Sequence, residues 1–191
     1  MGVDVELTPF QPVGPYFHVM LRDEPPGVAS LVTADTRGER IVIEGAVRDG
    51  AGKPVTDALV EIWQADAGGR YGHPGDPGSP LADASFGGYG RVATDREGRF
   101  RFETIRPGRV PGPDARLQAP HVLVSLFAPG IVTRCWTRIY FEDEASNAAD
   151  AVLELVPTAR RDTLLARLTA PGCYVFDIIL QGSGETVFFE A

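Results

Sequence analysis

Short apolar runs, many of them β-branched or alternating with polar residues, are separated by turn sequences over most of the chain from residue 40 onward. Residues 41–47 and 58–64 are two such runs, and the turn sequence DGAG lies between them at 49–52. Runs of this length bounded by glycine, proline or aspartate are typical of strands. The 22 glycines and 16 prolines, about a fifth of the chain, are too many for a helical protein. The sequence therefore predicts an all-β fold.

The second half of the chain continues this pattern. In residues 91–106, Arg99 and Arg101 alternate with Phe100 and Phe102, which predicts a strand with one solvated and one packed face. Further strands are expected at 121–127, 131–141, 174–180 and 186–189, the last two flanking a turn at 182–184. One short helix is expected near 159–168. We predict a mostly antiparallel β-sandwich over residues 40–191.

The first 39 residues differ from the rest because they combine many prolines and glycines with aromatic residues but show no strand period. We interpret residues 1–39 as an extended N-terminal arm that docks on a partner, and residues 40–191 as the sandwich domain. Three prolines in the segment 8–16 restrict the free arm, so it would lose little entropy on docking.

Charge and composition exclude several classes of partner. Asp and Glu number 26 against 18 Lys and Arg, which gives a net charge of −8 and disfavours nucleic acid and anionic membranes. An anionic ligand would have to meet a local cluster of arginines. No apolar run is long enough to span a membrane, and the first residues lack the basic and apolar pattern of a secretion signal, so we expect a cytoplasmic protein. Cys135 and Cys173 lack a CxxC spacing and are expected to be buried thiols.

Residues that could carry chemistry are few. The three histidines, His18, His73 and His121, show no metal-binding spacing, and no serine lies in a nucleophile motif. Taken alone, His121 at the start of an apolar strand is best interpreted as a hydrogen-bonded core histidine. Tyr71 is either a phenolate ligand or a turn tyrosine packed over the sheet.

Several blocks of sequence, in a fixed order, resemble the intradiol ring-cleavage dioxygenases. The blocks are TPFQPVGPY at 8–16, LVEIWQADAGGRY at 59–71, FGGYGR at 86–91, APH at 119–121, RIYFEDEA at 138–145 and QGSGETVFF at 181–189. Enzymes of this family hold a non-haem Fe(III) with two tyrosines and two histidines and use O2 to cleave a catechol-type aromatic ring. The resemblance implies that function and a small aromatic substrate.

The iron ligands of the family are only partly present. Carried over by position, they fall on Tyr71 and His121, which are retained, and on Val110 and Leu123, which offer no lone pair. Gln118 occupies the position of a family arginine. The resemblance thus implies a subunit that has no catalytic residue and no metal of its own, paired in a hetero-oligomer with an iron-bearing subunit that holds the Fe(III).

The resemblance also implies a role for the arm. In such assemblies the arm of the iron-free subunit lines the pocket of its partner, which maps onto Gly14, Pro15 and Tyr16. Arg134 and Arg138 are candidates to replace an arginine that the family carries where this chain has Pro129; a family threonine is likewise replaced by Pro12. An alternative function is a non-catalytic, transthyretin-like β-sandwich binding module, because the strand-and-turn pattern alone fits both.

Overall fold

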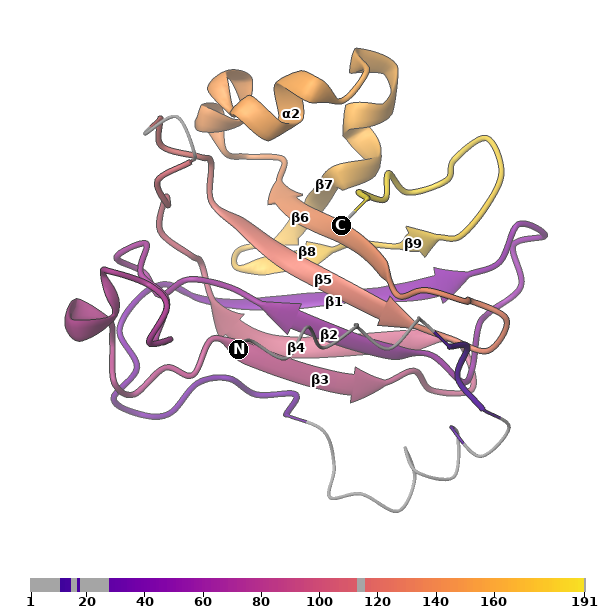
Figure 1. Ribbon diagram of the computed structural model, residues 1–191, viewed down its shortest axis with the longest axis horizontal. Helices are drawn as coiled ribbons and strands as arrows, with labels where there is room; N and C mark the ends of the chain where they lie inside the picture. Colours follow the sequence, from indigo (N-terminus) through magenta and orange to yellow (C-terminus); the bar gives the residue numbers. More distant parts are fainter. Residues whose placement is uncertain (1–10, 15–16, 18–27, 113–115, 191) are drawn as a thin grey trace, which may run out of the picture.

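The computed structural model describes residues 11–14, 17, 28–112 and 116–190 (Figure 1). In that part of the chain, the strands are β1 (Arg40–Arg48), β2 (Leu59–Trp63), β3 (Tyr89–Ala93), β4 (Arg99–Ile105), β5 (His121–Phe127), β6 (Cys135–Phe141), β7 (Leu165–Ala170), β8 (Cys173–Val175) and β9 (Ile178–Ile179). The helical elements there are η1 (Ser79–Leu81), η2 (Ala145–Ala149), α2 (Ala151–Leu155) and η3 (Thr158–Leu164). The all-β prediction is confirmed.

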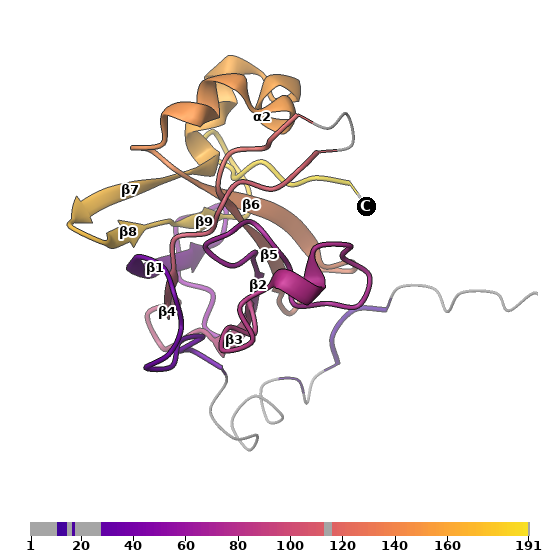
Figure 2. The same ribbon diagram turned by 90° about the vertical axis from the view of Figure 1, so that its left-hand side faces the viewer.

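The strands form one mixed sheet that nearly closes on itself. Its order is β3-β2-β5-β6-β7-β8-β1-β4, with β9 added beside β1. The two end strands, β3 and β4, follow each other in the chain, and the sheet curves until they lie close together (Figures 1 and 2). The larger of two buried apolar clusters fills the space that this curved sheet encloses, and a smaller one packs residues 153–164 against Tyr140 of β6.

The prediction of a mostly antiparallel sandwich needs correction, because three strand pairs are parallel. These are β6 with β7, β1 with β8 and β1 with β9. Adjacent parallel strands need a long crossover, and residues 142–164, which contain η2, α2 and η3, connect β6 to β7 (Figure 1). This helical crossover, which the sequence pattern did not reveal, turns two antiparallel layers into a mixed, barrel-like sheet.

The expected helix at 159–168 was wrong in type and extent. The 3₁₀ helix η3 ends at Leu164, and strand β7 starts at Leu165. Leu165 and Ala166 pair with Tyr140 and Phe141 of β6, so strand pairing overrides the helical spacing of the leucines. The expected strand at 186–189 is reduced to a single bridge between Phe189 and Trp136.

Other expectations hold with shifted boundaries. Phe100 and Phe102 of β4 are buried while Arg99 and Arg101 are exposed, as the alternation predicted. The expected strand at 131–141 begins only at 135, and the one at 174–180 is divided into β8 and β9. Cys135 and Cys173 are free and only partly buried. No helix within the described ranges combines the length and the apolarity needed to cross a membrane.

Gly45 in β1 permits the change of partner from β8 to β9. The backbone N–H of Phe176 donates to the Glu44 carbonyl (2.8 Å), and the N–H of Ala46 donates to Oδ1 of Asp177 (2.9 Å). A Cβ at Gly45 would lie 1.8 Å from the carbonyl oxygen of Phe176. The connection between the two parallel pairs therefore passes against β1 only because position 45 has no side chain.

We predict that Gly45→Ala lowers the free energy of unfolding by at least about 2 kcal/mol, because backbone of two elements would have to separate. Gly184→Ala is the matched control, since a Cβ there has no neighbour within 4 Å among the described residues. Chemical denaturation of both variants measures the difference. Equal stabilities of Gly45→Ala and wild type would contradict the close approach.

Candidate functional site

One cavity of about 710 Å³ brings together the residues that the family resemblance singled out. Tyr71, Val110, His121, Leu123 and Arg138 all line it. They come from four separate parts of the chain, so only the fold places them side by side. We call it the Arg138 cavity.

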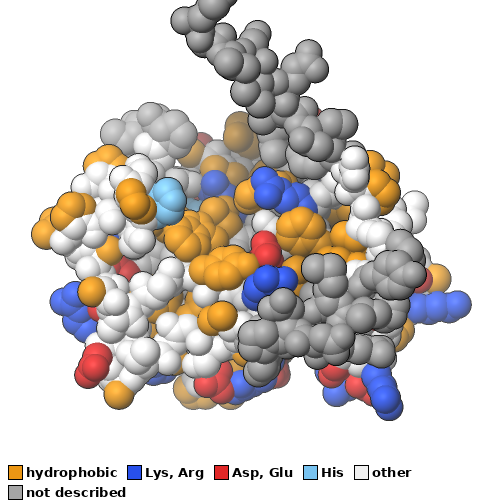
Figure 3. All heavy atoms as spheres, turned by 60° about the horizontal axis from the view of Figure 1, so that its bottom comes forward, with side chains coloured by type: hydrophobic (Ala, Val, Ile, Leu, Met, Phe, Trp, Pro, Cys, Tyr) orange, Lys and Arg blue, Asp and Glu red, His pale blue; other side chains and the backbone are white. Residues whose placement is uncertain are grey.

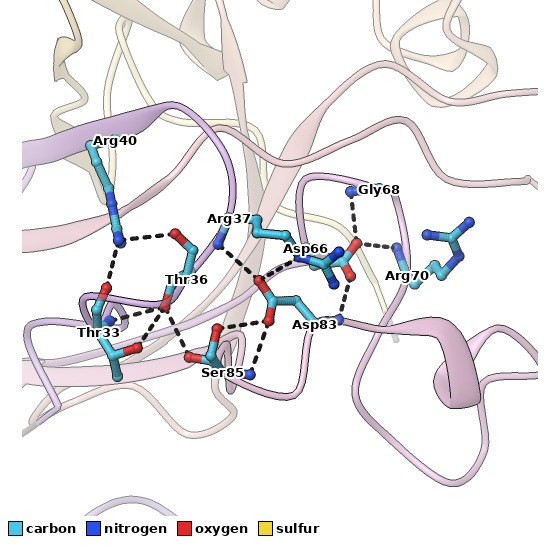
Figure 4. A network of polar contacts seen from close by, with 9 residues as sticks. All are labelled: Thr33, Thr36, Arg37, Arg40, Asp66, Gly68, Arg70, Asp83 and Ser85. Atoms are coloured by element: carbon cyan, nitrogen blue, oxygen red, sulfur yellow. Dashed lines mark hydrogen bonds and ion pairs between the residues drawn. The ribbon is translucent and has the colours of Figure 1, made fainter.

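Asp66 fixes the loop that presents Tyr71 to this cavity (Figure 4). Its Oδ1 accepts hydrogen bonds from the backbone N–H groups of Gly68 (2.8 Å) and Arg70 (3.0 Å). Its Oδ2 accepts from the N–H of Asp83 (2.8 Å), whose own carboxylate accepts from the N–H groups of Arg37 and Ser85. An aspartate that satisfies several nearby backbone donors stabilises a tight turn, and the Tyr71 loop is fixed in this way.

Two glycines hold the next segment against that loop. Gly69 has φ +74°, and a Cβ there would lie 2.0 Å from the carbonyl oxygen of Arg109. A Cβ at Gly108 would lie 2.4 Å from the backbone nitrogen of Gly69. The backbone at Gly69 is in direct contact with the backbone at Gly108 and Arg109, and this contact brings the buried Val110 to the wall of the cavity.

Tyr71 packs on Trp63 of β2, with ring centroids 5.8 Å apart and the planes nearly parallel. Its backbone N–H donates to Oδ2 of Asp76 (2.7 Å). Burial raises the pKa of the Tyr71 phenol, although the positive charge of Arg138 opposes that rise. Burial thus disfavours the phenolate form of this side chain.

His121 is 4% exposed and begins β5. Its Nδ1–H donates to the carbonyl of Ala119 (2.8 Å), and the ring lies against Tyr140 with centroids 5.7 Å apart. Burial, followed by the charge of Arg138, lowers the pKa of His121 to about 4. The expectation of a hydrogen-bonded core histidine describes this geometry, and the neutral ring also faces the cavity.

A polar chain runs from Arg138 into the core. Nη1 of Arg138 donates to Oε1 of Gln118 (2.7 Å) and to the hydroxyl of Tyr140 (3.2 Å). The Tyr140 hydroxyl donates to Oδ1 of Asp150 (3.1 Å), which is completely buried. Asp150 also accepts from the N–H of Ala119 (2.7 Å) through Oδ2. Sequence reasoning missed Asp150, although an aspartate directly before a helical segment is a recognisable N-cap signal.

The residues present do not fit the ferric ion that the family implies. Of the four ligand positions, two have only hydrocarbon side chains, one is a phenol and one is a histidine. Hard anionic donors favour Fe(III), and a guanidinium beside the cavity repels a cation. No cluster of three or more His, Cys, Asp or Glu side chains that could hold a metal occurs among the described residues.

The remaining expected site residues lie elsewhere. Gly14 is exposed, and a Cβ there would have no neighbour within 4 Å in the described part of the chain. Pro15 and Tyr16 lie outside the described residues. The guanidinium of Arg134 covers the ring of Trp136 at 4.1 Å instead of lining the cavity. On one face of the molecule, hydrophobic side chains gather with Lys or Arg side chains among them (Figure 3).

The buried histidine predicts an acid-sensitive stability. Because the pKa of His121 is about 4 in the folded chain and near 6.5 when unfolded, the unfolded state binds more protons between these values. Stability from this group is complete above pH 6.5 and falls as the pH drops toward 4. We expect a loss of about 2 kcal/mol by pH 5 that His121→Asn does not show, since Asn keeps a donor near Nδ1.

Urea unfolding at pH 7 and pH 5 checks this difference, with exposed His73→Asn as the matched control. The charged groups around His121 are Arg138 and Asp150, which do not change between the variants. Identical pH dependence of wild type and His121→Asn would refute the assignment.

Comparison with known proteins agrees with this geometry. A sequence profile for a family described as dioxygenase matches residues 13–182. The chain is 41% identical to the protocatechuate 3,4-dioxygenase alpha chain of Burkholderia cepacia, over 97% of this chain and 98% of that protein. It is 38% identical to the beta chain from the same organism, over 91% of this chain and 75% of that protein.

Solved structures show the same architecture. The dioxygenase domain of a dioxygenase carbohydrate-binding protein fusion from Streptomyces sp. SirexAA-E superposes with a TM-score of 0.63 and 34% identity, covering 93% of this chain and 100% of that one. The family match over residues 13–182 includes the strands, the crossover and the loops around the Arg138 cavity. This chain belongs to the dioxygenase family that includes the intradiol ring-cleavage enzymes.

Proposed function

We propose that this chain is the alpha-type, iron-free subunit of a protocatechuate 3,4-dioxygenase and works with an iron-bearing beta subunit. The assembly would insert both atoms of O2 into protocatechuate between the two hydroxyl-bearing carbons, giving 3-carboxy-cis,cis-muconate. The observation that carries the proposal is the replacement of two ligand positions by Val110 and Leu123 in a cavity whose surroundings match the family.

The cavity supports a division of labour between two related chains. The loops around it are held in place by the hydrogen bonds of Asp66 and by the backbone contact between Gly69 and Gly108. Its donor set nevertheless does not suit Fe(III), so the metal would have to be held by the beta subunit. Similarity to both alpha and beta chains of one enzyme agrees with a hetero-oligomer of two paralogous subunits.

The contribution of this chain to the partner's chemistry would come from the arm, residues 1–39. Gly14 carries no side chain and is exposed, so a ligand or a partner backbone could approach it closely. The assignment of Gly14, Pro15 and Tyr16 to the pocket wall of the partner is part of the proposal. The alternative of a transthyretin-like binding module is not supported, because the similarity to dioxygenase chains covers 97% of the sequence.

We predict that the chain purified alone holds less than about a tenth of an iron atom per chain, since two of the four ligand positions have no donor atom. Metal analysis and the visible absorption of tyrosinate bound to Fe(III) measure this. Co-purification with a beta chain is the positive control, and iron is expected in the complex. A coloured, stoichiometric ferric centre in the lone chain would show that the division of labour is wrong.

A second prediction concerns Gly14. Gly14→Leu is expected to leave the melting temperature of the lone chain unchanged, because no described atom lies within 4 Å of the new Cβ. In the assembled enzyme it should raise KM for protocatechuate about tenfold by crowding the partner's pocket. Gly184→Leu, at a similarly open position outside the arm, should leave KM unchanged.

Steady-state kinetics on complexes of verified composition, checked by mass photometry, separates the pocket role from simple packing. An unchanged KM for Gly14→Leu in a fully assembled complex would remove the arm from the active site.

A further inference from the structure

The two end strands of the sheet, β3 and β4, do not pair with each other. Within the described part of the chain, β3 pairs with β2 and β4 pairs with β1. Residues 28–31 lie between the two free edges: the N–H of Glu103 in β4 donates to a carbonyl of this segment (2.8 Å), and its carbonyl accepts from the N–H of Leu31 (2.8 Å). On the other side, the N–H of Arg91 in β3 donates to the Val28 carbonyl (3.1 Å). This segment therefore closes the seam of the sheet.

The seam is held by few contacts. Leu31 is the one buried side chain of residues 28–31, whereas Val28 is 46% exposed. Gly90 of β3 leaves room for the segment, since a Cβ there would lie 2.9 Å from the carbonyl oxygen of Val28 and 2.7 Å from Cδ1 of Leu31. An element held by one buried side chain and a few hydrogen bonds opens at a lower free-energy cost than strands in the core. We therefore expect the seam to open locally while the rest of the chain stays folded.

The chain continues from the seam into the turn 33–38, which is bonded to a buried carboxylate (Figure 4). The N–H of Arg37 donates to Oδ2 of Asp83 (2.9 Å), and Oγ1 of Thr36 donates to the Ser85 carbonyl (2.9 Å). Asp83 is 8% exposed, and among the described residues only Arg37 donates to its Oδ2. A buried acceptor that loses its donor is costly, so displacement of the turn also destabilises the loop that carries Asp83.

Asp83 extends this dependence to the loop that presents Tyr71. Its N–H donates to Oδ2 of Asp66 (2.8 Å), and Oδ1 of Asp66 accepts from the N–H groups of Gly68 and Arg70, as Figure 4 shows. Among the described residues, Asp83 is the one donor to Oδ2 of Asp66. The hydrogen bonds therefore run without a break from the turn 33–38 to the Tyr71 loop, residues 66–71.

A packing contact joins the same two parts of the chain. Gly38 has φ +116°, and a Cβ there would lie 2.8 Å from the Cβ of Ala67, which directly follows Asp66. The turn after the seam and the Tyr71 loop are thus connected both through the Asp83 carboxylate and by direct contact. A change of position in one of them must alter the contacts of the other.

We infer that residues 28–38 form a latch that opens and closes as one unit with the Tyr71 loop, so that displacement of the chain before residue 28 changes the wall of the Arg138 cavity. In the open state, β3 and β4 have free edges and Asp83 has lost its bond to Arg37. A shared two-state element of this kind is what physical coupling between distant sites requires. The latch is a property of the lone chain and holds whether or not the proposed partner subunit exists.

Native-state hydrogen exchange of the full-length lone chain, followed for single amides by NMR at low denaturant concentrations, tests the latch. The amides of Leu31, Arg91 and Glu103 report on the seam, and those of Gly68 and Arg70 report on the Tyr71 loop. All five are expected to share one opening free energy and one denaturant dependence, and to exchange at least about tenfold faster than the amides of β5 and β6. Different opening free energies for the two groups, or exchange of all five only by global unfolding, would overturn the inference.

Gly90→Ala perturbs the seam from the β3 side, because the three nearest neighbours of the added Cβ are Leu31, Val28 and Phe102. It should speed exchange at least about tenfold at the seam amides and, through the latch, at the amides of the Tyr71 loop. Gly87→Ala is the matched control, since a Cβ there has no neighbour within 4 Å in the described ranges, and it should exchange as wild type does.

Asp83→Ala tests the reverse direction. It removes the acceptor of the Arg37 N–H but keeps the N–H that donates to Asp66, and it should speed exchange at the seam amides as well as in the Tyr71 loop. Thermal melts establish that each variant is folded; where one does not fold, the exchange of the wild type decides. Faster exchange confined to the seam in a folded Gly90→Ala, or confined to the Tyr71 loop in a folded Asp83→Ala, would overturn the coupling.

Discussion

The completely buried carboxylate of Asp150 is the interaction on which the rest of this structure depends. It caps α2 by accepting from the N–H groups of Val152 and Leu153, and it accepts from the N–H of Ala119 and the hydroxyl of Tyr140. A buried charge is tolerated only when its acceptor sites are filled, and here four donors from three segments fill them. The same carboxylate therefore joins the helical crossover, the start of β5 and strand β6, and it sets the positions of the histidine and arginine side chains in the cavity.

The fold and the chemistry of the cavity are separable in this chain. The loops around the cavity are held by backbone contacts between glycines and by the hydrogen bonds of Asp66, none of which involves a residue at a metal-ligand position. Val110 and Leu123 can therefore occupy ligand positions without breaking the contacts that hold these loops. With hydrocarbon at two ligand positions, the charged side chains among the described residues that line the cavity are three arginines and one aspartate.

The position of several strands was predictable, because the alternation of apolar and polar residues and the length of an apolar run are sufficient to indicate a strand. The alternation around Phe100 and Phe102 fixed which face of β4 is buried, and the limits of β5 agree with its apolar run. The leucines near 164–168 misled the prediction, since their helical spacing is equally compatible with a 3₁₀ turn followed by a strand. Whether such a segment becomes a strand depends on a pairing edge, here that of β6, and sequence spacing carries no information about that edge.

The sequence by itself determined the chain's class, its family and which donor atoms are present, because side-chain identity decides whether a lone pair can exist at positions 110 and 123. Only the tertiary structure decided that those positions share one cavity with Tyr71, His121 and Arg138, and that the strands around it form a mixed sheet. The physical reason is that a hollow and its charge are created by segments distant in sequence. Burial of His121 and the hydrogen bonds from Arg138 through Tyr140 to Asp150 arise from packing between those segments, which no local pattern encodes.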